Sequence, residues 1–181
     1  MIFTFLGTSA GEEYPGIWCS CINCAKARKL GGKNLRRNSC AVIDSDVMLD
    51  IGKTAHIQAE RYGKDLTDIR TLLVTHSHND HFNIHTLWAR QMVPGYDKLH
   101  FEEQKKLSSP RFSSLKTLDI FGSSQVERAL RQTFFSAKEY YVNLEAANIN
   151  FNLIEPYKSY KAHNLKFFTL EGNHRDVEGV N

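Results

Sequence analysis

The chain has 181 residues, of which 41% are hydrophobic and 24% charged, and its formal net charge is +3. This size and composition predict one globular domain with a substantial core. The small net charge does not by itself indicate nucleic-acid binding, and the sequence has no run of about 18 apolar residues that could cross a membrane. The first residues lack the basic start and apolar stretch of a secretory signal, so we expect a cytoplasmic protein without a membrane partner.

Short apolar runs alternate with amphipathic stretches along the chain, and this alternation predicts an α/β domain over residues 1–181. We predict strands at 2–6, 39–43, 47–51, 71–75, 117–121, 149–154 and 165–170. We predict helices at 23–30, 54–62, 84–92 and from Ser124 to about Phe135, where Ser124 and Glu127 have the spacing of a capping box. The turn signal at 44–46 predicts a hairpin.

Residues 96–116 differ in character from their surroundings. The stretch is charged at first and is then interrupted by Ser108-Ser109-Pro110, which does not suit a helix. We interpret it as an insertion or lid within the domain.

Three histidines and one aspartate lie within six residues, directly after the predicted strand at 71–75. They are His76, His78, Asp80 and His81. Neutral imidazole and carboxylate groups are the ligands that zinc-like ions prefer, and the end of a strand gives such ligands a rigid base. The spacing predicts a metal site that can hold up to two ions at one edge of a sheet.

The segment Thr75 to His81 resembles the signature loop of the metallo-β-lactamase superfamily. Three further stretches resemble landmarks of that superfamily: Gly7-Thr8, Leu49-Asp50-Ile51-Gly52 and Leu170-Glu171-Gly172-Asn173-His174. The resemblance implies an αββα four-layer sandwich and a hydrolase with zinc or manganese at the active site. It also implies the role of each residue: His76, His78 and His174 hold the first ion, Asp80 and His81 hold the second, Asp80 orients the nucleophile, and Asp50 supports the loop through hydrogen bonds.

Two landmarks of the superfamily are not found after His174. These are a bridging aspartate at the end of another strand and a final histidine. Only seven residues follow His174, and Asp176 lies too close to it and is expected to be a solvated loop residue. We therefore expect a sandwich that is incomplete at the C-terminus, with a weakened second metal position.

Cys19, Cys21 and Cys24 form a C-x-C-x-x-C cluster, which in a chain without a secretory signal indicates a metal site rather than disulfides. Three thiolates predict one structural zinc whose fourth ligand is either Cys40 or, as the favoured candidate, a histidine outside this chain. Cys40 lies in an apolar run and is expected in the core. The cluster resembles that of the cyclic phosphodiesterases of phosphonate breakdown, although proteins of pyrroloquinoline quinone synthesis share a similar one.

These features favour a metal-dependent phosphodiesterase that acts on a small, cyclic phosphodiester or a nucleotide through a metal-bound hydroxide. Arg36 and Arg37 are candidate phosphate contacts, although solvated surface charge is the favoured interpretation for them. One alternative is a tRNA 3′-end nuclease of the same superfamily, for which a basic RNA-binding arm would be expected; nucleic acid is the less favoured partner. The other alternative is a non-catalytic, zinc-stabilised fragment. The sequence leaves open whether the chain forms a homodimer.

Overall fold

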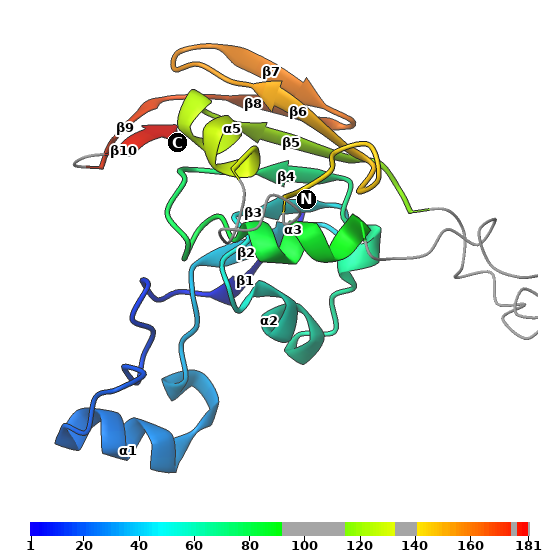
Figure 1. Cartoon of the computed structure of the whole chain (residues 1–181). Coiled ribbons are helices and arrows are strands. Elements are labelled where there is room, and N and C mark those ends of the chain that lie inside the picture. The colour runs from blue at the N-terminus through cyan, green and yellow to red at the C-terminus, as the bar shows by residue number, and fades with distance from the viewer. Residues whose placement is uncertain (92–114, 133–140, 175–176, 181) are drawn as a thin grey trace, which may run out of the picture.

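A computed structural model describes residues 1–91, 115–132, 141–174 and 177–180. Its centre is one six-stranded sheet in the order β1-β2-β3-β4-β5-β6 (Figure 1). The strands are β1 Phe3–Gly7, β2 Cys40–Ile43, β3 Val47–Leu49, β4 Thr71–Leu73, β5 Leu118–Gly122 and β6 Ile149–Leu153. The first three are antiparallel neighbours, whereas β3, β4, β5 and β6 run parallel to one another. Polar loops that follow β3 and β4 therefore meet at one edge of the sheet.

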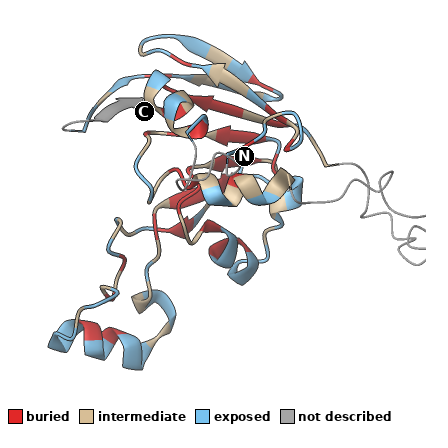
Figure 2. Ribbon diagram, viewed as in Figure 1, coloured by how far each residue is buried: buried red, intermediate tan, exposed pale blue. Residues whose placement is uncertain are grey.

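Helices cover one face of this sheet. They are α2 Ala55–Arg61, α3 Ile84–Gln91 and α5 Ser124–Leu130 (Figure 1). Alternate residues of the strands face these helices, as the two-residue period of a strand requires. The buried side chains on this face form the main core, which includes Val42, Met48, Leu72, Ile120 and Leu130. The red segments at the centre of Figure 2 mark this core between the sheet and the helices.

Two hairpins follow the sheet along the chain: β7 Ser159–Ala162 with β8 Leu165–Phe168, and β9 Glu171–His174 with β10 Val177–Val180. The first hairpin covers part of the sheet face opposite the helices, where Phe121 of β5 contacts Phe167 of β8 edge to face at 5.4 Å between ring centroids. The described residues thus form three layers: helices, the six-stranded sheet and the β7–β8 hairpin.

An arm leaves the body between β1 and β2 and carries α1 Ile22–Leu30 and the short 3₁₀ helix Gly32–Asn34 (Figure 1). The two ends of the arm pair with each other where they join the sheet. Ser9 N–H donates to the Arg37 carbonyl at 2.8 Å, and Ser39 N–H donates to the Ser9 carbonyl at 2.9 Å. In the described ranges, no helix combines the length and apolarity needed to cross a membrane.

The strands and helices predicted from the sequence are present within a few residues, including the β2–β3 hairpin, except that α5 ends at Leu130 and its predicted end near Phe135 lies outside the described residues. One prediction at the residue level was wrong: Ser124 is the first helical residue of α5 rather than its cap, since Ser123 occupies the cap position with extended backbone angles. His174 ends strand β9 of the β9–β10 hairpin. The predicted insertion at 96–116 falls outside the described residues, apart from Leu115 and Lys116, as does Asp176.

Candidate metal centre

His76, His78 and His174 come together at the edge of the sheet, although His174 is nearly a hundred residues away in the chain. One ligand atom from each of the three lies within 4.8 Å of the others. The His76 ring lies 4.9 Å from the His78 ring and 4.5 Å from the His174 ring, measured between centroids. Three imidazole nitrogens at this spacing can hold one divalent ion.

The two nitrogens of the His76 ring differ in their hydrogen bonding, and this difference supports the assignment of the ring as a metal ligand. Its Nδ1 lies 3.0 Å from the Thr75 hydroxyl, whereas its Nε2 is buried and has no hydrogen-bond partner in the described part of the chain. A buried polar atom without a partner costs about 1–3 kcal/mol, and metal coordination would remove this cost. Burial, with the charges of His81 and His174, lowers the pKa of His76 to about 4. The ring is therefore neutral near pH 7, which is the form that binds metals.

Asp80 and His81 lie in the same loop, with 3.5 Å between Asp80 Oδ2 and His81 Nε2, and the His81 ring lies 4.1 Å from the His76 ring between centroids. They are the two ligands predicted for a second ion. The structure adds no third described histidine, cysteine or carboxylate to them in a metal-ligand cluster. Two ligands are fewer than the three or more that protein metal sites normally use, and the weakness of the second position stays a prediction.

Asp50, directly after β3, holds the histidine loop through hydrogen bonds. Its carboxylate accepts from the Thr75 N–H at 2.8 Å and lies 2.7 Å from His81 Nδ1. Burial acts to lower the pKa of His81, but the hydrogen bond and charge of Asp50, together with the charge of Asp80, outweigh burial and raise it. Because Nδ1 faces Asp50, the Nε2 atom of His81 is left facing Asp80. This is the arrangement in which a carboxylate orients a metal-binding imidazole.

Backbone hydrogen bonds also join the loop to the end of β3. Ile51 N–H donates to the His81 carbonyl at 2.7 Å, and Asn83 N–H donates to the Ile51 carbonyl at 2.7 Å. Within the loop, the Asn83 side-chain amide donates to the Asn79 side-chain oxygen at 2.7 Å. The sequence reasoning did not assign Thr75, Asn79 or Asn83 a supporting role. Their positions within and directly after the histidine loop were the only signal available.

The three cysteines of the arm also come together, with their Sγ atoms within 4.8 Å of one another. Cys21 caps α1, and its Sγ accepts from the Cys24 N–H at 3.5 Å. Arg28 on α1 braces the preceding loop by donating to the carbonyls of Cys19 at 2.8 Å and Gly16 at 2.7 Å. Three thiols held this way fit three of the four ligands of a structural zinc.

Cys40 does not join the cysteine cluster but is buried in β2 as predicted, with its Sγ 3.5 Å from the Gln58 side-chain oxygen. The two candidate phosphate contacts are also occupied within the arm. Arg37 forms an ion pair with the buried carboxylate of Glu13, and the Arg36 guanidinium lies 6.0 Å from the centroid of the Tyr14 ring.

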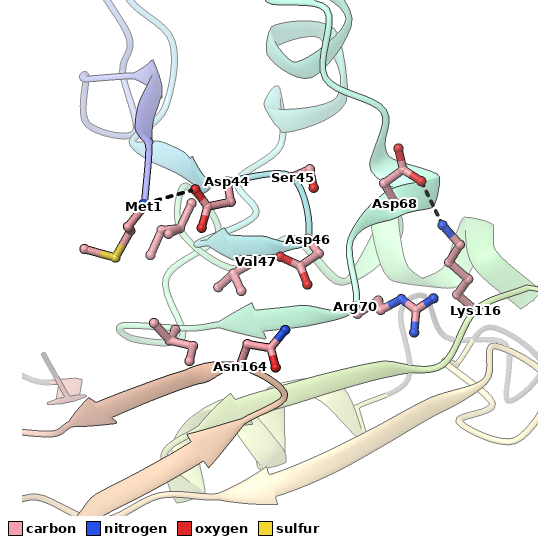
Figure 3. A pocket seen from close by; sticks show the side chains of 11 residues that line it. Met1, Asp44, Ser45, Asp46, Val47, Asp68, Arg70, Lys116 and Asn164 are labelled. Atoms are coloured by element: carbon pink, nitrogen blue, oxygen red, sulfur yellow. Dashed lines mark hydrogen bonds and ion pairs between the residues drawn. The ribbon is translucent and has the colours of Figure 1, made fainter.

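A cavity of about 610 Å³ lies away from this chemistry, at the opposite edge of the sheet (Figure 3). It is lined by the β2–β3 turn and by Arg70 and Lys116, which precede β4 and β5. Its charges are largely paired: Lys116 with Asp68 at 2.8 Å, and the N-terminal amine with Asp44 at 3.9 Å. The histidine edge, rather than this cavity, carries the candidate metal-binding groups.

Comparison with solved structures identifies the fold. A diphosphatase of the PhnP family aligns over 98% of this chain with a TM-score of 0.63 and 19% identity. Zinc-bound PqqB from Methylobacterium extorquens aligns over 94% with a TM-score of 0.63 and 14% identity. The metallo-β-lactamase-fold protein YhfI from Bacillus subtilis aligns over 97% with a TM-score of 0.57 and 14% identity. No protein-family model and no curated protein sequence matches.

The chain therefore has the α/β metallo-β-lactamase fold, as the sequence predicted. It spans 59%, 55% and 55% of the length of those three solved chains. The candidate metal-binding histidines and cysteines lie within this part.

Proposed function

We propose that the chain carries the metal-binding part of a metal-dependent hydrolase that acts on small phosphodiesters. The observation that carries this proposal is the buried Nε2 atom of His76, which lacks a hydrogen-bond partner and lies beside the ligand atoms of His78 and His174. A divalent ion bound there would act as a Lewis acid and lower the pKa of a bound water. Zinc or manganese suits imidazole and carboxylate ligands of this kind.

The chain's own residues prepare the site for hydrolysis. Asp50 fixes the orientation of His81, and Asp80 keeps 18% of its side chain exposed next to His81. A carboxylate in this position can accept a hydrogen bond or a proton from an attacking water and hold it in line with a substrate. Asp80 is accordingly the proposed catalytic residue of this chain.

Two observations favour phosphodiesters among the substrates that hydrolases of this fold could accept. The C-x-C-x-x-C motif resembles that of cyclic phosphodiesterases, and the structure brings its three thiols together. The PhnP-family protein that aligns over 98% of the chain is a diphosphatase, which supports hydrolysis at phosphorus in general rather than a phosphodiester in particular. Fold alone does not determine a substrate, so the choice rests on the combination of the cluster with this relative.

The proposal is tested by assaying hydrolysis of bis(p-nitrophenyl) phosphate and of a 2′,3′-cyclic nucleotide, with and without added zinc or manganese. We expect metal-dependent turnover that falls by about a hundredfold or more in His78→Asn, since removal of a ligand weakens metal binding. The exposed His56 on α2 provides the matched control, and His56→Asn should leave turnover unchanged. Absence of metal-dependent turnover of both substrates would refute the proposal, as would equal activity of the two variants.

A further inference from the structure

The root of the arm borders the candidate site at Gly11, which lies beside Asp80 with room for one methyl group between them. A Cβ atom built on Gly11 would stand 3.5 Å from Asp80 Cγ and 3.6 Å from Asp80 Oδ2, which is ordinary van der Waals contact. The loop at 8–13 therefore limits the space into which the Asp80 carboxylate can rotate.

Hydrogen bonds from neighbouring segments hold the loop at 8–13 in place. The Lys53 ammonium donates to the Gly11 carbonyl at 2.9 Å, and the fully buried Asn38 donates from its side-chain amide to the Ala10 carbonyl at 3.0 Å. The paired backbone bonds of Ser9 with Arg37 and Ser39 fix the preceding residue. Of these contacts, the Lys53 bond is the one made at Gly11, the residue that lies beside Asp80.

Lys53 is also tied to the other side of Asp80 through the backbone. Its neighbour Gly52 packs so closely on the histidine loop that a Cβ there would lie 2.1 Å from the Asp80 carbonyl oxygen. Gly52 thus packs against the main chain of Asp80. The next residue, Lys53, is hydrogen-bonded to Gly11, which lies beside the Asp80 side chain.

We propose that Lys53 is a positioning residue for Asp80, acting through its hydrogen bond to the Gly11 carbonyl. By fixing Gly11, Lys53 keeps the loop at 8–13 at a constant distance from the Asp80 carboxylate and so limits the room in which the carboxylate can rotate away from His81. This proposal rests on the proposed function, in which Asp80 is a second-ion ligand and orients the attacking water. A carboxylate that must rotate before it can act loses part of the advantage of a preformed site.

The test compares Lys53→Met with Lys53→Arg and with Lys64→Met. Lys64 provides the matched control, because its ammonium also donates to a backbone carbonyl, that of Asp44 at 3.1 Å, at the opposite edge of the sheet. Three quantities are measured for the whole chain: the Asp80 amide chemical shift in metal-free protein, the affinity for manganese, and the kcat and KM of diester hydrolysis.

We expect Lys53→Met to shift the Asp80 amide resonance, to weaken manganese binding about tenfold and to lower kcat by about tenfold with little change in KM. Lys53→Arg should recover most of each effect, since a guanidinium can donate to the same carbonyl. Lys64→Met should match the wild type in all three quantities.

The positioning role is overturned if Lys53→Met leaves the Asp80 resonance and manganese affinity unchanged, or if Lys64→Met changes them as much. Lys53→Arg behaving like Lys53→Met would also count against it. Because the resonance and the manganese affinity do not depend on turnover, a wild-type chain that hydrolyses no diester would refute the proposed function while these two measurements still decide the role of Lys53.

Discussion

Asp50 is the residue on which the geometry of the histidine loop depends most. It is buried and adopts a left-handed backbone conformation, with φ at 59°, which aspartate tolerates better than most residues. From this position one carboxylate reaches the Thr75 N–H, the Thr75 hydroxyl and His81 Nδ1. Its contacts explain why the aspartate follows β3 directly, beside the end of β4.

Replacing Asp50 with asparagine should change both metal binding and stability. Asparagine can still accept from Thr75, but its amide would donate toward His81 Nδ1 and so favour the tautomer with a proton on Nε2, which cannot bind metal. We expect metal affinity to fall by about 10- to 100-fold, measured by titration against a competing chelator. Asp44→Asn, at the exposed β2–β3 turn, should have no such effect.

The stability cost of Asp50→Asn should depend on pH. The folded-state pKa of His81 is raised above its usual value, so its stabilising contribution is fully present below about pH 6.5 and is lost as the pH rises through the folded pKa. Urea unfolding of metal-free protein should therefore show a larger loss at pH 5.5 than at pH 9, on the order of 1–3 kcal/mol at the lower pH. A loss that is equal at both pH values would contradict this account of the pair.

Cys21 and Cys40 should differ in reactivity when the protein is free of metal. The Cys24 N–H donates to Cys21 and, with the Cys19 side chain, lowers the Cys21 pKa to about 7, whereas burial and the charge of Asp50 raise the Cys40 pKa to about 12. Because the thiolate is the reactive form, alkylation of Cys21 should rise with pH through a midpoint near 7 while Cys40 stays unmodified to pH 9. Peptide mass mapping reports each site, and in 8 M urea the difference should vanish.

At the scale of elements, the site depends on how closely the histidine loop packs against the residues that follow β3. The two segments exchange backbone hydrogen bonds, and Gly52 leaves no room between itself and the Asp80 carbonyl. A side chain at position 52 would meet backbone, which cannot move aside as a flexible side chain can.

Gly52→Ala should therefore lower stability and disturb the metal site together. We expect a loss of roughly 1–3 kcal/mol in the free energy of unfolding and a clear drop in metal affinity. Gly11→Ala is the contrasting variant, because its added methyl would make only ordinary contact with Asp80 and should leave the melting temperature within about 2 °C. Equal melting temperatures for both variants would show that the close packing at Gly52 is not required.

The main strands were predictable from sequence because their residues are apolar and strongly patterned. Leu118 to Phe121 and Thr71 to Leu73 are examples. Strands β7, β9 and β10 carry weaker signals. Glu171-Gly172-Asn173-His174 combines residues with low strand propensity and becomes β9 only through pairing with β10. The extent of such a hairpin depends on tertiary contacts that local sequence does not contain.

The candidate site was predictable to a similar degree. The spacing of His76, His78, Asp80 and His81 marks a metal loop on its own, and the structure places it at a strand end as expected. The approach of His174 could be inferred only through resemblance, because it depends on how a distant hairpin folds back. The contacts of Lys53 and Gly52 carry no sequence signal, since they arise from backbone packing.

At the scale of the molecule, the two candidate metal sites lie in different parts of the structure. The histidine site is built on the sheet, whereas the cysteine site lies on the arm between β1 and β2 (Figure 1). The arm has few described buried side chains of its own, among them Cys24 and Ala27. A structural zinc would therefore supply order that a small core cannot.

The central claim is that both clusters bind metal, and elemental mass spectrometry of the purified chain tests it most directly. The protein should be prepared without chelator or added metal and compared with His78→Asn and Cys21→Ser. We predict at least two metal ions per chain, zinc among them, with each variant losing the ion of its own cluster and retaining the other. A wild-type chain without bound metal, or variants with unchanged metal content, would contradict the account.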